Sequence, residues 1–407
     1  MFSRGWLILG ALLLGFGLAV HSGGPFLIGA ILLLGAGASY LSHRYCLECV
    51  EFRRSFVPRR AFYGETVTLI LEVTNRKWLP LAWLEVTDEL PEEIVPQRGR
   101  IIPSVRQRRQ HLLHLFSLRW FERVRRRVTV MCTARGYFAL GPARLRSGDL
   151  FGITSNGKTL EETDRLIVYP KIVPLEALGL PALHPLGDQR APRPLLEDPV
   201  RTVGVRDYLP EDPMRRVHWK ATARAGRLQT RQYEATTAHR LVVMLNMDTL
   251  GEYAGYRGFV RPLLELSIMV AASLAAWATD QGIPVGVYAN GYLPGGLQRV
   301  RLAPALGEAH LTGILEALAK VFPTPVIPLG DLMALEAGVL PWGTTAVVVT
   351  AVIDSPLLAG IRMLRDAGHA VVLVLVGDQV QDPHLGTPTH RVKGEVGWRA
   401  MDEIRLV

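Results

Sequence analysis

Residues 206–224 read RDYLPEDPMRRVHWKATAR, a block of charged and aromatic residues set between apolar segments. Asp212 followed by Pro213 is typical of a helix N-cap with proline at the first helical position, and Gly226 is a typical stop. The block therefore predicts a helix of about three turns. Cations that recur every four residues would share one face of this helix. They are Arg216, Lys220 and Arg224.

Two interpretations of this helix remain open. In the first, Trp219 is buried and Arg215, Lys220 and Arg224 pair with Asp207, Asp212 or Glu234, so that the helix braces the preceding connector against the domain that follows. In the second, the cationic face docks a partner protein, because arginine is enriched at interface hot spots. His218 is a candidate general base or metal ligand, but no orienting partner or nucleophile is evident beside it. We therefore predict no catalytic residue.

Eleven residues of this block, in fixed register, resemble the signature of the bacterial domain of unknown function 58 family. They are Arg206, Tyr208, Asp212, Arg215, Val217, His218, Trp219, Lys220, Thr222, Ala223 and Arg224. Residues 135–142, 148–152 and 167–170 are similar to other family segments, so the resemblance covers nearly the whole chain, although Glu211 stands where the family usually has glycine. The resemblance implies a C-terminal von Willebrand factor type A-like domain. It also implies association with MoxR-type AAA+ ATPases and transglutaminase-like membrane proteins, in envelope or complex assembly.

Two apolar runs near the N-terminus, residues 5–20 and 24–41, contain no Lys, Arg, Asp or Glu. Residues 21–25 between them are typical of a turn. Each run would span about 24–27 Å as a helix, slightly less than a hydrocarbon core of about 30 Å, so flanking residues would complete the crossing. A cleaved signal peptide is the alternative, but no small-residue cleavage site follows Val20 and a second apolar run does. Arginines flank both ends, which predicts a two-helix membrane hairpin over residues 1–43 with the soluble region in the cytoplasm.

The rest of the chain divides into segments of different pattern. Alternating β-rich runs, at residues 66–74, 84–87 and 128–133, predict a β-sandwich over residues 44–169. Seven prolines between 170 and 199 predict an extended connector over residues 170–204. The signature segment occupies residues 205–234. From 235 to 407, apolar strands alternate with helices, which predicts an α/β domain with a parallel sheet. The expected strands are 241–245, 283–288, 346–353 and 370–376, and the expected helices are 262–280, 308–321 and 356–367.

The basic character of the chain is concentrated in the expected β-sandwich. The formal net charge is +9 and the pI is about 9.7, which permits attraction to anionic lipid or nucleic acid. Much of the excess comes from Arg98, Arg100, Arg106, Arg108, Arg109, Arg119, Arg123, Arg125, Arg126 and Arg127. Because Arg123, Arg125 and Arg127 alternate, a solvated strand face is the simplest explanation.

One motif matches a phosphate-binding loop by letters alone. Residues 152–159 read GITSNGKT. A P-loop works only where a strand precedes it and a helix begins at its lysine. Too few residues separate Thr159 from the strand expected at 167–169, so we expect Lys158 to lie in a surface hairpin.

Two sets of residues are weak candidates for metal binding. A zinc set would consist of His43, Cys46, Cys49 and Cys132, but a single Cys-x-x-Cys pair is a weak signal. The type A-like fold that the resemblance implies often holds a divalent ion through Asp-x-Ser-x-Ser. Asn246 and Asp248 stand there instead, and they leave no two hydroxyls at the required spacing. We expect no metal and no cofactor.

These patterns together predict a membrane-anchored scaffold or adaptor, not an enzyme, whose soluble region faces the cytoplasm and binds protein partners. An enzyme of unidentified hydrolytic type is the first alternative, and a surface binder of lipid or nucleic acid is the second.

Overall fold

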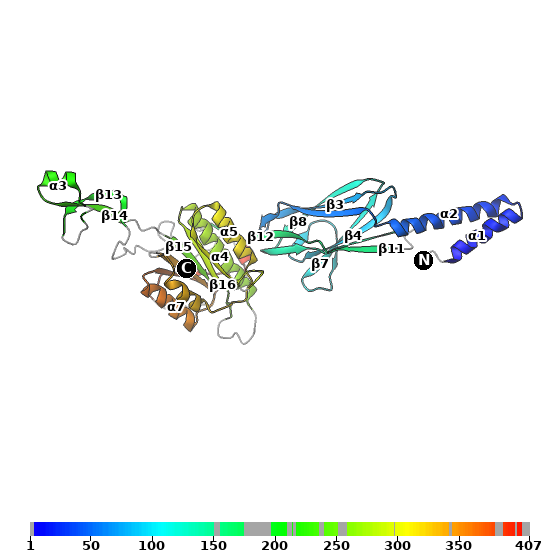
Figure 1. Cartoon of the computed structure of the whole chain (residues 1–407). Coiled ribbons are helices and arrows are strands. Elements are labelled where there is room, and N and C mark those ends of the chain that lie inside the picture. Colours follow the sequence, from blue (N-terminus) through cyan, green and yellow to red (C-terminus); the bar gives the residue numbers. More distant parts are fainter. Residues whose placement is uncertain are drawn as a thin grey trace. The chain divides into compact units, whose positions relative to one another are not determined.

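The computed structural model describes residues 4–149, 155–174, 197–209, 214, 217–235, 240–250, 259–296, 298–341, 344–378, 386–394 and 397–400. The chain divides into two compact units, Met1–Lys171 and Ile172–Val407 (Figure 1).

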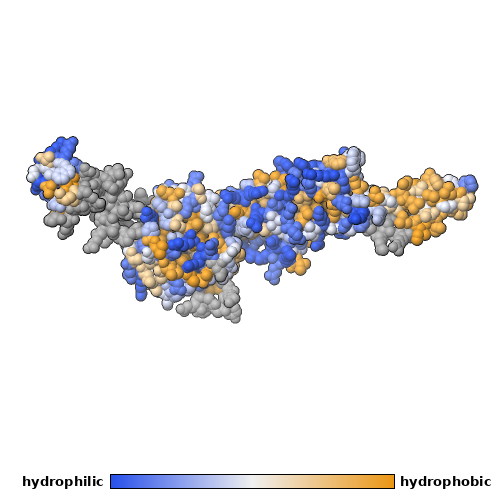
Figure 2. Space-filling model, viewed as in Figure 1, coloured by the Kyte–Doolittle hydropathy of each residue, from blue (hydrophilic) through white to orange (hydrophobic). Residues whose placement is uncertain are grey.

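Two apolar helices lie side by side near the N-terminus, α1 (Arg4–Ala19) and α2 (Gly23–Tyr45). Their backbones are in close contact, since a Cβ atom on Gly29 would lie 2.5 Å from the Leu14 nitrogen. Glycine is common where membrane helices pack closely. Apolar residues dominate the surface of the pair (Figure 2), and α2 is long and apolar enough to cross a membrane. The expected pair of helices and its turn are confirmed, and the pair suggests membrane association.

The rest of the first unit is a β-sandwich built from two antiparallel sheets around one core of buried Leu, Val, Ile and Phe side chains. One sheet has the order β1 (Val50–Val57), β3 (Thr66–Asn75), β8 (Arg123–Cys132), β5 (Ile94–Pro96). The other has the order β11 (Ser155–Leu160), β10 (Ala143–Gly148), β4 (Leu81–Pro91), β7 (Arg109–Leu118), β6 (Arg100–Pro103). A small third sheet contains β2 (Arg60–Phe62), β12 (Asp164–Tyr169) and β9 (Gly136–Leu140). The expected strands at 66–74, 84–87 and 128–133 are therefore confirmed.

Arginines occupy two different environments in this sandwich. Arg125 on β8 is exposed and pairs with Glu72 at 2.7 Å, so the alternating arginines do form a solvated strand face. Arg54 on β1 is buried. Its guanidinium donates to Asp88 and to the Glu162 carbonyl, and its Nε donates to Asp164 at 2.8 Å. Burial raises the pKa of Asp88 to about 6, while Arg54 acts in the opposite direction.

In the second unit, β13 (Glu197–Asp207) pairs antiparallel with β14 (Gln229–Ala235), and α3 (Trp219–Ala225) lies between them in sequence. The extended connector expected over 170–204 is therefore too long. Pro199 lies within β13, and the strand begins at Glu197. Two-strand pairing tolerates a proline because an edge strand leaves some N–H groups without a ladder partner.

The remainder is a six-stranded sheet with the order β17 (Arg299–Ala305), β16 (Val285–Tyr292), β15 (Arg240–Leu245), β18 (Thr344–Thr350), β19 (Ala370–Val376), β20 (Thr389–Val392). All neighbouring pairs are parallel except β16 with β17. The helices α4 (Arg261–Asp280) and α5 (Glu308–Lys320) cover one face, and α6 (Leu329–Ala337) and α7 (Ser355–Asp366) cover the other (Figure 1). A short 3-10 helix, η3 (Trp398–Ala400), contacts α4. The mixed parallel sheet and its four expected strands are confirmed, whereas β17, β20 and α6 were not expected.

The helix α4 also has the length and apolar composition of a membrane span, but most of it is buried against the sheet. It is therefore a core helix of this unit, as its position in the strand and helix alternation predicts.

Candidate functional site

The helix of the signature segment is shorter than the sequence predicts. It begins at Trp219, and the Nδ1 atom of His218 caps it by accepting a hydrogen bond from the Ala221 N–H at 3.1 Å. It ends at Gly226, whose φ of +68° favours glycine. Asp212, the expected N-cap, lies outside the described residues, but Val217 forms a β-bridge to Thr230 just before His218, so the described helix does not extend back past that bridge. The backbone of Val217 therefore pairs with Thr230 of β14 and does not continue the helix.

The helix is attached to the β13–β14 pair by its two ends. The His218 N–H donates to the Gln229 carbonyl at 2.7 Å, and the Gln229 N–H donates to the Thr222 hydroxyl at 3.0 Å. The Gln229 side chain also donates to Asp207, and Arg227 pairs with Asp207 at 3.2 Å. Gln229 is therefore a residue of this site that the sequence analysis missed. The only sequence signal for Gln229 is that it is a polar residue at the start of a strand, shortly after Gly226 ends the helix.

Trp219 is exposed, which overturns the expectation that it is buried. Its exposed fraction is 64%, and α3 has no buried residue. Truncation of an indole in this environment leaves no cavity, so it is not expected to cost the 3–5 kcal/mol, roughly, of a buried aromatic. The helix is too short and too polar to bury a face of its own.

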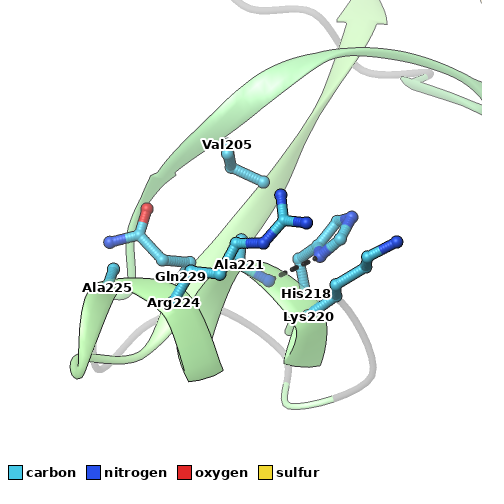
Figure 3. Close-up of a pocket in the computed structure, with 7 residues that line it drawn as sticks. All are labelled: Val205, His218, Lys220, Ala221, Arg224, Ala225 and Gln229. Carbon is cyan, nitrogen blue, oxygen red and sulfur yellow. Dashed lines mark hydrogen bonds between the residues drawn. The ribbon is translucent and has the colours of Figure 1, made fainter.

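Lys220 and Arg224 lie on the same side of α3 as the His218 ring. The three side chains point away from the helix in one general direction, and the Arg224 guanidinium lies below Val205 of β13 (Figure 3). They line an open pocket of about 420 Å³ together with Ala221, Ala225 and Gln229. Within the described part of the chain, neither Lys220 nor Arg224 forms an ion pair. We call Trp219, Lys220 and Arg224 the α3 surface.

Other predicted site residues have different positions. The Arg206 guanidinium donates to the Asp207 carbonyl at 3.2 Å, and the Tyr208 N–H donates to the Leu228 carbonyl at 3.0 Å, so both help to hold the end of β13. Asp212, Arg215 and Arg216 lie outside the described residues. Of the carboxylates in the predicted brace, Asp207 pairs with Arg227, and Asp212 and the Glu234 side chain lie outside the described part of the chain.

The weak ion candidate Asn246 belongs to a neutral network at the carboxyl ends of the parallel strands. Its Nδ2 atom donates to the Thr350 hydroxyl at 3.1 Å, and its Oδ1 atom accepts from Asn290 at 3.1 Å and from the Asp248 N–H at 3.0 Å. Asn290 and Thr350 are fully buried. All polar atoms of the Asn246 amide are therefore engaged, and one carboxylate oxygen of Asp248 accepts the Leu250 N–H at 2.9 Å. Sequence analysis missed Asn290, near the end of β16, and Thr350, the last residue of β18.

The remaining motifs do not assemble a site in the described residues. No group of three or more His, Cys, Asp or Glu side chains is placed there to hold a metal ion. Of the possible zinc ligands, Cys46 instead donates to the His43 carbonyl at 3.3 Å, and Cys132 is buried in the sandwich core. Lys158 lies in β11, antiparallel to β10. A P-loop needs a helix that begins at its lysine, so the motif is not a phosphate-binding loop, as expected.

One family model, of a family without a known activity, matches part of the chain. Residues 204–387 match the family model described as "Protein of unknown function DUF58". This match supports the DUF58 family. No curated protein matches the chain.

Three of the solved structures similar to this chain each match less than a third of it. A cohesin module from the Clostridium perfringens family 33 glycoside hydrolase is 13% identical and covers 29% of this chain and 94% of its own, with a TM-score of 0.20. A non-cellulosomal cohesin from Archaeoglobus fulgidus is 10% identical, covering 29% and 90%, with a TM-score of 0.20. The sporulation control protein Spo0M from Bacillus subtilis is 12% identical, covering 30% and 50%, with a TM-score of 0.18.

Proposed function

We propose that this DUF58 protein is a membrane-anchored adaptor that holds a protein partner at the cytoplasmic side of the membrane through the α3 surface. The α1–α2 pair is the transmembrane hairpin in this proposal. The partner implied by the family resemblance is a MoxR-type AAA+ ATPase, and a transglutaminase-like membrane protein is a second. The observation that carries the proposal is that Trp219, Lys220 and Arg224 are all exposed together on one short helix.

The chemistry of this surface suits a protein partner with acidic groups. Tryptophan and arginine are the residues most enriched at interface hot spots. A guanidinium binds carboxylates through two parallel hydrogen bonds, and an ammonium adds a point charge. Because Lys220 and Arg224 have no ion pair among the described residues, their pairing with carboxylates of a partner breaks no described ion pair.

The membrane part of the proposal rests on composition and packing. Leu34, Leu12 and Ile31 have exposed fractions of 74%, 65% and 59%, which is costly in water and favourable in lipid. Arg44 and the arginines that follow it favour a cytoplasmic location for the end of α2.

The strand order of the sheet supports a type A-like assignment for residues 235–407. An edge strand, β17, runs antiparallel to five parallel strands, and β15 lies beside both β16 and β18. Strands β16 and β17 therefore lie on one side of β15, and β18, β19 and β20 lie on the other. In open α/β sheets, ligands bind at the carboxyl ends of the strands at such a switch point. Here the Asn246 network fills that position with neutral groups, which favours partner binding elsewhere, on the α3 surface.

Copurification from solubilised membranes tests the docking contact. The charge-reversal variant Lys220→Glu/Arg224→Glu should capture the ATPase at least about tenfold less well, equivalent to about 1.4 kcal/mol. Arg362→Glu is the matched control, since Arg362 is an exposed cation on α7 without a described ion pair, and it should capture the ATPase normally. Both variants should keep their thermal stability, because surface substitutions usually change it by less than about 0.5 kcal/mol. Full capture by the double variant would show that the α3 surface is not the docking site.

A further inference from the structure

The end of the sandwich nearest α2 carries a cluster of exposed aromatic side chains. Trp78 lies in the loop between β3 and β4, and Trp120 and Phe121 lie in the loop between β7 and β8. Their exposed fractions are 79%, 60% and 55%. Trp78 and Phe121 contact each other edge to face, with ring centroids 5.1 Å apart. We call these three residues the aromatic rim.

Both loops lie beside the start of β1, directly after α2. Val50, the first residue of β1, pairs with Asn75, the last residue of β3, and Arg123 of β8 pairs with Thr74. The strand ends that flank both loops therefore meet at the end of the sandwich where the helix enters. No separate linker intervenes, because Cys46 and Leu47 already belong to the sandwich core.

Hydrogen bonds fix the rim to the helix end. The Lys77 ammonium donates to the Glu48 carbonyl at 2.7 Å and to the Cys46 carbonyl at 2.5 Å, one residue beyond the last turn of α2. The Phe121 N–H donates to the Lys77 carbonyl at 3.3 Å. Trp78, which follows Lys77, is therefore held close to the level of Tyr45, where α2 ends.

The fully buried Asn75 connects the two loops to each other. Its side-chain Nδ2 donates to the Leu79 carbonyl at 3.0 Å and to the Arg119 carbonyl at 2.9 Å. Its backbone N–H donates to the Glu122 carbonyl at 2.9 Å. Phe121 adopts a φ of +52°, which is uncommon for a bulky residue, and this conformation is maintained on a loop that Asn75 holds in place. The exposed rings are thus held in a defined arrangement.

The distance along α2 matches the thickness of a lipid headgroup layer. The hydroxyl of the buried Ser39 donates to Asp149 at 2.9 Å, so the sandwich covers one face of the helix from Ser39 onward. Tyr45 follows Leu41, the last residue of the apolar run, by four positions, about 6 Å of helix. The polar layer on each side of a bilayer core is roughly 5–8 Å thick. The aromatic rim therefore lies at the height of the headgroups when the apolar part of α2 lies in the hydrocarbon.

Cations outnumber carboxylates around the rim. Glu48, Glu51, Glu72 and Glu122 are the carboxylates beside it, and Asp149 is buried against Ser39. The cations there are Arg44, Arg53, Arg76, Lys77, Arg119 and Arg123. Cations with apolar stems and amphipathic rings are the side chains that occupy a membrane interface, and anionic lipids attract such a basic surface.

We propose that the aromatic rim inserts into the headgroup layer of an anionic membrane and fixes the sandwich against the bilayer surface. Continuity with the apolar surface of α2 and the positive charge identify the bilayer as the occupant. This inference rests on the membrane hairpin of the proposed function, but the hairpin alone does not require it, because a hairpin can also carry a domain that stands clear of the lipid.

Fluorescent labels on the full-length chain in vesicles test the insertion. Cys49, the exposed cysteine, is first changed to Ser, while the buried Cys46 and Cys132 are retained. An environment-sensitive label is then attached to Trp120→Cys. The control is Val105→Cys, a fully exposed position in the loop between β6 and β7, at the opposite end of the sandwich. The vesicles contain phosphatidylglycerol and phosphatidylcholine, with bromine on the acyl chains near the headgroup as the quencher.

We expect the label at position 120 to be blue-shifted and quenched severalfold more than the label at 105. The additional changes Trp78→Ala and Phe121→Ala should reduce that quenching. If both labels stay in water while the chain resists carbonate extraction, the insertion is wrong and the hairpin stands. If carbonate releases the chain, the hairpin and the insertion both fail. A blue shift at 120 without quenching would mean that protein covers the rim, from a second copy or a partner, and would overturn the proposal.

Discussion

The buried Arg54 on β1 should stabilise the sandwich far more than Arg125, an exposed arginine two strands away on β8 of the same sheet. Replacing Arg54 with Met leaves Asp88, which is fully buried, without its cation and leaves the Glu162 carbonyl without its donor. Removing one partner of a buried ion pair costs about 3–5 kcal/mol. The matched control is Arg125→Met, which breaks a pair with Glu72 at the surface and should cost far less, because solvent screens surface ion pairs.

The cost of Arg54→Met should depend on pH in a defined direction. Arg54 opposes the effect of burial on the pKa of Asp88, so this pKa, about 6 in the native protein, should rise further in the variant. A carboxyl whose pKa is raised by folding adds stability below its unfolded pKa of about 3.9, and loses it as pH rises through the folded value. The variant therefore loses more stability than the wild type between pH 5 and pH 8, and its relative cost should be larger at pH 8.

A urea series with a short hydrogen-exchange pulse measures this difference within the full chain. Peptides from β3 and β8 report unfolding of the sandwich separately from the second unit, which matters because a chain of two units need not unfold in two states. The reasoning is refuted if Arg54→Met shifts the midpoint no more than Arg125→Met does, or if its shift is as large at pH 5 as at pH 8.

Two further predictions follow from burial and from helix packing. Burial, with a contribution from Arg126, lowers the pKa of His114 to about 4, so the folded sandwich binds fewer protons than the unfolded chain between about pH 6.5 and 4 and loses stability as pH falls through this window. His114→Gln should reduce that acid sensitivity in the same urea series, and an unchanged slope with pH would contradict it. In the hairpin, Gly29→Leu should separate α1 from α2, because a Cβ atom there meets the α1 backbone, whereas Gly35→Leu should not, because a Cβ atom there meets nothing within 4 Å. Cysteine cross-linking between the two helices compares the variants, and equal cross-linking would show that the close contact is not required.

Local patterns determined most elements of this protein. The apolar runs predicted α1 and α2. Alternation of apolar and polar residues predicted β3 and β8, because one face of each strand packs on the core. Near-continuous apolar strands gave β15, β18 and β19, which are buried on both faces. The sequence predicts these elements because burial of one or both faces sets a hydrophobic periodicity within each segment.

Tertiary structure decided the features that depend on partners distant in sequence. Val217 pairs with Thr230 directly before α3, so the described helix begins only at Trp219, which is exposed. The Asn246 network required Asn290 and Thr350, which are contributed by other strands. The aromatic rim likewise depends on Asn75, which joins its two loops by a hydrogen bond to Arg119, 44 positions along the chain. Spacing along a chain cannot specify such contacts, since the free energy of each depends on which strands the sheet places side by side.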